Sequence, residues 1–245
     1  MLEAFRTALV NTIYPPRCLA CTEPTDRPHG LCPACWRDTH FIAGTRCRKC
    51  GVPLIGESRG EDNCETCRRN PPAWDRGAAA ILYAGAGRKV MLALKHADRL
   101  DMVPPLAGWM ATAGRDLIEE ADLIAPVPLH WIRLLRRRYN QSAELARRLG
   151  RSAGRPMVPD LLVRRRATPP QTGNRIVRAA NQAGALTVNP RHAATVAGRR
   201  VLLVDDVLTT GATLSTCADC LRAAGAGGID VLVLARVAFE DSLGL

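Results

Sequence analysis

A stretch of thirteen residues near the C-terminus combines an apolar run, two carboxylates and a small hydroxyl-rich turn that opens a helical pattern. Its residues are Val201, Leu202, Leu203, Val204, Asp205, Asp206, Val207, Leu208, Thr209, Thr210, Gly211, Ala212 and Thr213. The apolar run predicts a buried strand, and open α/β sheets bind ligands at the carboxyl ends of such strands. The backbone N–H groups of residues 209–213 then lie at a helix N-terminus and suit a phosphate group. Gly211 allows the backbone to approach that phosphate closely.

Two adjacent carboxylates, Asp205 and Asp206, stand between the strand and the turn. They do not suit a phosphate, because charges of the same sign repel. They suit neutral hydroxyls, such as the two of a ribose, or a divalent metal ion beside them. The segment lacks the Gly-Lys-Ser/Thr ending of a Walker-type loop. We therefore expect a sugar phosphate site over residues 205–213, the alternative being a strand and polar turn without function.

Eight cysteines in the first part of the chain form four Cys-x-x-Cys pairs. Two thiolates of one tight turn reach a single ion, and two such pairs give the closed tetrahedral shell of structural zinc. Consecutive pairing is simpler than interleaved pairing, which stays open as the alternative. A disulfide framework would suit a small secreted domain, but no secretion signal is recognisable. We expect two structural Zn²⁺ ions, which fold the module and do no chemistry. The expected ligands are Cys18, Cys21, Cys32 and Cys35 for one ion, and Cys47, Cys50, Cys64 and Cys67 for the other.

A fifth pair, Cys217 and Cys220, lies in a predicted helix near the C-terminus. Cys217 continues an apolar stripe with Leu214 and Leu221, at helical spacing. A free cysteine in such a stripe behaves as a small hydrophobic residue. We expect this pair to pack in the core, and a metal or redox role is the alternative.

The composition changes near residue 72, where Asn70, Pro71 and Pro72 suggest a stiff linker. We expect one unit over residues 1–72, with a short N-terminal helix and the cysteine-rich module, and a second over residues 73–245. Alternating strand and helix patterns in the second unit predict an α/β fold with a mainly parallel sheet flanked by helices. The predicted strands span 78–83, 123–128, 161–164, 201–204 and 229–237. The predicted helices span 88–96, 106–121, 141–149 and 213–224, and a long polar loop spans 165–182.

The chain carries a formal net charge of +11, with 34 lysines and arginines against 23 acidic residues. An excess of this kind suits an anionic partner such as nucleic acid or a polyphosphate, and a solvated surface is the alternative. No stretch approaches the length of a membrane span, and no targeting signal is recognisable. We expect a chain that does not span a membrane and resides in the cytoplasm.

The thirteen-residue segment resembles the signature of type I phosphoribosyltransferases at every position. From Cys18 to about Val237, the chain also resembles the competence-protein ComF family, in which a double zinc ribbon precedes a phosphoribosyltransferase domain. The chain departs from the family pattern at Arg138, where glycine is usual, and at Leu186, where an aromatic residue is usual. The supporting segments are 94–96, 126–129, 138–141, 144–146 and 162–171.

The resemblance implies that 5-phosphoribosyl diphosphate binds together with Mg²⁺ at residues 205–213. It implies further substrate contacts from Lys95 and from a diphosphate-facing loop that holds Arg138, Asn140 and Gln141. Loop 165–182 would cover the site. An active enzyme would be a glycosyltransferase that transfers a pentosyl group, although some relatives with this fold bind the ligand only to regulate.

The resemblance also implies a link to DNA uptake in natural transformation, with competence-machinery proteins as partners. The alternative is a protein that handles single-stranded DNA through its phosphate site and basic surface, without turnover. The basic charge and the zinc ribbons favour this alternative. The scarcity of aromatic residues, 4% of the chain, speaks against it, because bases stack on aromatic rings.

Overall fold

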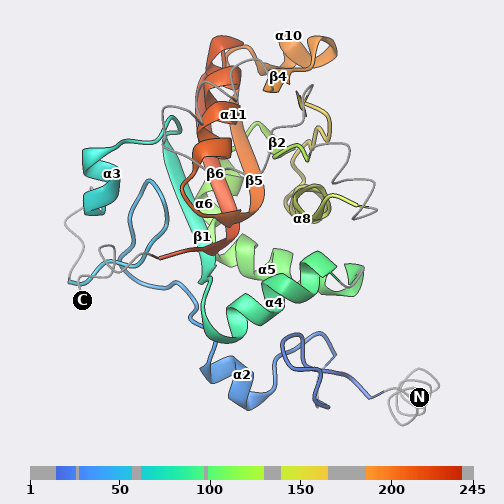
Figure 1. Cartoon of the computed structure of the whole chain (residues 1–245). Helices are drawn as coiled ribbons and strands as arrows, with labels where there is room; N and C mark the ends of the chain where they lie inside the picture. The colour runs from blue at the N-terminus through green and yellow to red at the C-terminus, as the bar shows by residue number, and fades with distance from the viewer. Residues whose placement is uncertain are drawn as a thin grey trace.

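The computed structural model describes residues 15–25, 28–56, 62–96, 99–129, 139–164 and 186–238. Its centre is a sheet of four parallel strands in the order β1-β6-β5-β2, which confirms the predicted α/β fold (Figure 1). The strands are β1 (Arg76–Leu82), β2 (Leu123–Pro126), β5 (Arg200–Leu208) and β6 (Gly228–Arg236).

Both faces of the sheet are covered, as the continuous apolar runs of its strands require. Alternate side chains of β5 enter different buried clusters, because successive residues of a strand point to opposite faces. Leu202 and Val204 pack with the helices α4, α5, α6 and α8, whereas Val201 and Leu203 pack with α11 and the strands β3 and β4. The helix bounds are α4 (Gly85–His96), α5 (Val103–Ala113), α6 (Arg115–Glu120), α8 (Gln141–Ala153) and α11 (Ala212–Ala223).

The helix predicted over residues 106–121 is two helices, so that expectation was wrong. α5 and α6 meet at Gly114, whose φ of −115° breaks the helical path. A Cβ atom at Gly114 would lie 2.6 Å from Cδ1 of Leu232 in the central strand β6. The break therefore lets the chain pass close over the sheet, and only glycine leaves room for that approach.

A two-stranded antiparallel sheet follows α8, formed by β3 (Leu162–Arg164) and β4 (Leu186–Val188). β4 was not predicted, because three residues are too few to show a strand pattern. A short 3₁₀ helix, η2 (Pro190–His192), and α10 (Ala193–Val196) lead to β5. The covering loop predicted over residues 165–182 lies outside the described residues.

The cysteine-rich module lies along the free edge of β1. Ile42 donates its backbone N–H to Ala80 (2.9 Å), and Leu82 donates to His40 (2.9 Å). Farther along the same strand, Gly77 donates to Arg48 (2.7 Å). The module thus covers a strand edge that would otherwise be open to pairing with another chain. Its helices are α2 (Pro33–Arg37) and α3 (Glu65–Arg69), and 3₁₀ helix η1 (Leu100–Met102) precedes α5.

The boundary near residue 72 stays a prediction, although it falls just after α3. The predicted N-terminal helix belongs to residues 1–14, which lie outside the described part of the chain. Among the described residues, no helix has both the length and the apolar character needed to cross a membrane.

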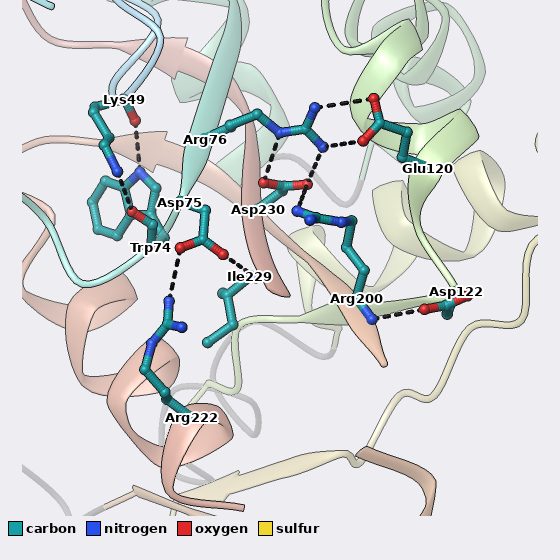
Figure 2. Close-up of polar contacts among 10 residues, drawn as sticks. All are labelled: Lys49, Trp74, Asp75, Arg76, Glu120, Asp122, Arg200, Arg222, Ile229 and Asp230. Atoms are coloured by element: carbon teal, nitrogen blue, oxygen red, sulfur yellow. Dashed lines mark hydrogen bonds and ion pairs between the residues drawn. The ribbon is translucent and has the colours of Figure 1, made fainter. Parts of the chain in front are cut away.

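The amino ends of the strands are joined by a buried ionic network. Asp230 of β6 is fully buried and accepts from Arg76 of β1 (2.7 Å) and from Arg200 of β5 (3.2 Å) (Figure 2). Arg76 also pairs with Glu120 of α6 (2.8 Å). A buried carboxylate needs such partners, because an unpaired charge is costly away from water. The network holds the sheet at the edge opposite the predicted ligand site.

Candidate ligand site and metal centres

Strand β5 is longer than the sequence predicts, and it carries both carboxylates within it. The predicted strand ends at Val204, whereas β5 continues through Asp205 and Asp206 to Leu208. Asp205 lies opposite Val233 of β6. Pairing with the central strand therefore holds the carboxylates on rigid backbone at the carboxyl edge of the sheet, where α/β proteins bind ligands.

The Asp205 carboxylate accepts two hydrogen bonds. Its Oδ1 atom accepts from the Ser142 hydroxyl (2.8 Å) and from the backbone N–H of Asp206 (2.9 Å). Burial, followed by repulsion from the Asp206 carboxylate, nevertheless raises the pKa of Asp205 to about 7. The side chain is therefore poised between its neutral and charged forms near neutral pH.

The Asp206 carboxylate pairs with Lys95, whose Nζ atom lies 3.2 Å from Oδ2. Lys95 lies in the last turn of α4, more than a hundred residues before β5 in the sequence. Both side chains are largely buried, so this pair is screened less than a surface salt bridge. The structure thus brings Lys95, which the sequence singled out, to the predicted carboxylate pair.

The N-terminus of α8 lies next to the carboxylate pair, where Ser142 contacts Asp205. Asn140 caps the helix by accepting from the Ser142 N–H (3.1 Å), and its amide donates to the Val127 carbonyl just after β2 (3.2 Å). Tyr139 donates its hydroxyl to the Leu94 carbonyl beside Lys95 (2.7 Å). Gln141 is buried at the first position of α8. Residues 139–142 thus tie α8 to β2 and α4, while Arg138 lies outside the described residues.

The predicted phosphate turn leads into α11. Gly211 immediately precedes that helix with a φ of +77°, and no side chain caps its N-terminus. The first N–H groups of a helix have no partner within the helix, and they lie at the positive end of its dipole. Thr209 and Thr210 are exposed beside them. This arrangement offers backbone donors to an anion next to the two carboxylates.

Three residues of this region were missed by the sequence analysis: Ser142, Trp74 and Arg236. Arg236 is only 4% exposed, and its Nη1 atom donates to the carbonyls of Leu208 (3.1 Å), Thr209 (2.9 Å) and Val237. It thereby fixes the path of the chain where β5 enters the turn. The only sequence feature that could have indicated a role for Arg236 is its position as a charged residue at the end of an apolar strand.

The eight cysteines of the module form two quartets by consecutive pairing: Cys18, Cys21, Cys32 and Cys35, and Cys47, Cys50, Cys64 and Cys67. The sulfur atoms of each quartet lie within 4.8 Å of one another. One edge in each, Cys21–Cys32 and Cys50–Cys64, measures 3.7 Å. A tetrahedron with Zn–S bonds of about 2.3 Å has edges of about 3.8 Å, so the two quartets suit two structural zinc sites.

The backbone supports a thiolate at Cys18 of the first quartet. The N–H groups of Ala20 and Cys32 point at the Cys18 sulfur, at 3.4 and 3.3 Å. Burial raises the pKa of Cys18, but the hydrogen bonds from backbone amides outweigh it and bring the pKa to about 6. All ten cysteines lie among the described residues and none is in a disulfide, which argues against a disulfide framework.

The fifth cysteine pair packs as predicted. Cys217 is fully buried in the cluster between α11 and the sheet, and neither Cys217 nor Cys220 joins a metal-type quartet among the described residues. Burial raises the pKa of the Cys217 thiol well above its usual range, which keeps it protonated and unreactive.

Comparison with known proteins agrees with this arrangement. A double zinc ribbon domain matches residues 9–72, and a phosphoribosyl transferase domain matches residues 139–239. DNA utilization protein YhgH of Escherichia coli (strain K12) is 31% identical over 232 residues, covering 91% of this chain and 97% of that protein. Competence protein F of Haemophilus influenzae is 30% identical over 217 residues, covering 85% and 91%.

Among solved structures, the allosteric regulatory enzyme of purine biosynthesis is 20% identical, with a TM-score of 0.36, over 74% of this chain and 31% of that one. At that TM-score, the likeness says nothing about function. The two domain matches and the relatives that align over nearly their whole length carry the assignment. The chain therefore belongs to the ComF-like competence protein family, in which a double zinc ribbon precedes a phosphoribosyltransferase-type domain.

Proposed function

We propose that the chain binds 5-phosphoribosyl diphosphate, together with Mg²⁺, at the carboxyl edge of β5. One observation carries the proposal: Asp205 and Asp206 lead within a few residues to the uncapped N-terminus of α11. Two acceptors for hydroxyls therefore lie beside a set of donors for a phosphate. A ribose 5-phosphate requires that combination.

In this proposal the 5-phosphate binds the backbone N–H groups of residues 209–213, and the ribose hydroxyls donate to Asp205 and Asp206. Val207 and Leu208 line the path between them. Asp206 already pairs with Lys95, so the carboxylates fit neutral hydroxyls better than a directly bound cation. Mg²⁺ would therefore be held by the diphosphate oxygens, where it would neutralise charge on the leaving group.

The ribose hydroxyls would free Lys95 to face the diphosphate, with Arg138, Asn140 and Gln141 on the neighbouring segment. Pentosyl transfer would then follow if an acceptor binds. The acceptor forms a bond to C1 of the ribose, the C1–O bond breaks, and its electron pair leaves with diphosphate. The acceptor proton passes to water or to the released diphosphate. The protein's part is placement and stabilisation of the leaving charge, and no side-chain nucleophile is required.

Calorimetric titration with phosphoribosyl diphosphate and Mg²⁺ tests the proposal. We expect saturable binding by the wild type, and loss of at least about 2 kcal/mol of binding free energy in an Asp205→Asn, Asp206→Asn variant. Asp219→Asn, which alters an exposed carboxylate on α11, should bind like the wild type. Zinc-loaded, folded wild type that binds no ligand would refute the proposal, and release of diphosphate with an acceptor would establish turnover.

A second role concerns single-stranded DNA, because relatives carry the names DNA utilization protein and competence protein. The structure adds an observation that the sequence hid. Trp36 and Phe41 of the cysteine-rich module meet Trp109 of α5 in one aromatic cluster, with ring centroids 4.7 Å apart for Trp36–Phe41 and 5.1 Å apart for Phe41–Trp109. Trp36 is 56% exposed, so its ring is accessible to a base. We propose cytoplasmic handling of imported single strands, alongside competence-machinery proteins.

Fluorescence anisotropy with a labelled oligothymidine checks this role. Binding should weaken steeply as salt rises, because phosphate contacts release counterions. Trp36→Ala should weaken binding by about 1–3 kcal/mol, the usual contribution of one stacked base. Ile55→Ala removes another exposed apolar side chain and serves as the control. Equal binding by all three proteins would remove the aromatic cluster from the interface.

A further inference from the structure

The segment that joins the cysteine module to β1 packs against the candidate phosphate turn. Its central residue, Trp74, is only 3% exposed. The indole belongs to the same buried cluster as all four cysteines of the second quartet and as Leu208 and Leu214, which flank the turn. Trp74 therefore lies between a metal centre and a ligand site that are far apart in the sequence.

On the metal side, Trp74 is joined to the backbone of the second quartet. Its Nε1 atom donates to the Lys49 carbonyl (2.6 Å), and the Lys49 ammonium donates back to the Trp74 carbonyl (3.2 Å) (Figure 2). Lys49 lies inside the turn between Cys47 and Cys50, which would both bind zinc. The shape of such a turn depends on the metal, because metal binding and folding are coupled in these modules.

On the ligand side, the indole lies close to the backbone of Gly211 and leaves no room there for a side chain. A Cβ atom at Gly211 would lie 2.7 Å from Cη2 and 3.4 Å from Cζ3 of Trp74. Gly211 directly precedes the first helical residue of α11, whose N–H groups would bind the phosphate. A shift of the ring would therefore change the start of that helix.

The segment cannot withdraw easily, because other bonds hold it to α11 and β6. Arg222 of α11 donates to the Ala73 carbonyl (3.2 Å) and to Asp75 (2.9 Å). The Asp75 carboxylate also accepts from the Ile229 N–H (2.8 Å), as Figure 2 shows, and the Asp75 N–H donates to the Ile229 carbonyl (2.7 Å). These contacts hold the backbone at both neighbours of Trp74. A change in the turn at Lys49 should therefore move the Trp74 ring, while the backbone on either side of it stays in place.

We infer that Trp74 is a positioning residue through which zinc in the second quartet sets the N-terminus of α11 and thereby the affinity for the phosphate ligand. The effect on affinity rests on the proposed function, whereas the effect on the helix start does not. Loss of zinc from the second quartet loosens the turn at Lys49, and the Trp74 indole shifts as a result. The first backbone N–H groups of α11, which follow Gly211, are then no longer held in one orientation.

Hydrogen exchange of the backbone amides at residues 209–214 tests the inference without any ligand. In Trp74→Ala, we expect these amides to exchange at least about threefold faster than in the wild type. Trp74→Phe keeps a ring beside Gly211 but loses the bond to Lys49, so it should show a smaller increase. Trp36→Ala removes an exposed indole from the other ribbon and should leave this segment unchanged. Unchanged β6 exchange verifies that each variant is folded.

A double-mutant cycle tests whether the second zinc site and Trp74 affect the start of α11 through the same contacts or independently of each other. Cys64→Ser should release the second zinc and accelerate exchange at residues 209–214 about as much as Trp74→Ala. Because both changes break the same path, Cys64→Ser combined with Trp74→Ala should add little to either alone. Full additivity, or unchanged exchange in Trp74→Ala, would overturn the inference.

Ligand titration separates this inference from the proposed function. Trp74→Ala should bind phosphoribosyl diphosphate about tenfold more weakly than the wild type. If the wild type binds and Trp74→Ala binds equally well, the inference fails while the proposed function stands. If the wild type does not bind, the proposed function fails, and the exchange experiment still decides whether Trp74 transmits the state of the second quartet.

Discussion

At the scale of single residues, Asp205 makes the stability of the fold depend on pH. Its usual pKa of 3.8 rises to about 7 through burial and the Asp206 carboxylate. Between these two pH values, Asp205 is protonated in the folded chain but ionised in the unfolded chain. The contribution of Asp205 to the free energy of unfolding is therefore fully present below pH 3.8 and is lost as the pH rises through about 7.

Replacing Asp205 should therefore change the pH dependence of stability. Asp205→Asn removes the titrating group, so its free energy of unfolding should rise relative to the wild type by on the order of 1–3 kcal/mol between pH 4 and pH 7. Urea unfolding across that range measures the difference. Asp219→Asn, at an exposed position, should follow the wild type at every pH. A constant offset between Asp205→Asn and the wild type would contradict the assigned origin of the pKa shift.

At the scale of elements, the start of α11 depends on backbone freedom and on space at one glycine. Gly211 has a φ of +77°, a region that side chains disfavour, and it also touches the Trp74 ring. Gly198 has a similar φ of +71°, but a Cβ atom added there would meet nothing within 4 Å. A side chain at Gly198 would meet backbone strain alone, whereas a side chain at Gly211 would meet both backbone strain and a steric clash.

Alanine at these two positions should have unequal effects. Gly198→Ala should cost about 1–2 kcal/mol of unfolding free energy, the penalty for the left-handed conformation alone. Gly211→Ala should cost at least about 1 kcal/mol more, because the added methyl group must displace the indole. Denaturant unfolding of both variants gives the comparison. Equal costs would mean that the ring moves aside freely, which would weaken the link between Trp74 and α11.

At the scale of the whole molecule, the two quartets are built into the fold to different degrees. Cys47 and its partners share a buried cluster with β5, β6 and α11. Cys18 and Cys35 form a small cluster with Ala86 of α4, and Cys21 remains partly exposed. The second quartet therefore belongs to the main core, whereas the first is attached at its margin.

Removing one zinc ion or the other should therefore lower the thermal stability by different amounts. Cys47→Ser and Cys21→Ser should each leave one zinc per chain, as elemental analysis would show. Cys47→Ser should lower the thermal midpoint more, because a polar oxygen and an open metal turn then adjoin the central sheet. Equal midpoints in the two variants would contradict the shared core. Retention of two zinc ions in both would refute the assigned ligands.

The parts of the protein that the sequence alone determined are those whose chemistry lies in one continuous stretch. The carboxylates and turn of residues 205–213 follow one another along the chain, and each Cys-x-x-Cys pair carries its own spacing. The apolar runs of β5 and β6 likewise indicated a parallel sheet, because both faces of such strands are buried. These features need only local geometry, so no long-range contact had to be known.

Only the tertiary structure decided which distant residues complete the site. The family resemblance implied a role for Lys95, but its pairing with Asp206 became visible only in the fold. Ser142 and Arg236 reach β5 and its turn from two different elements, and Trp74 reaches Gly211 from the segment before β1. The break at Gly114 is of the same kind, since it depends on the approach of Leu232. Nothing in the spacing of these residues records their proximity. Packing of the helices and the zinc ribbons on the sheet creates it, because burying their apolar faces fixes where each side chain points.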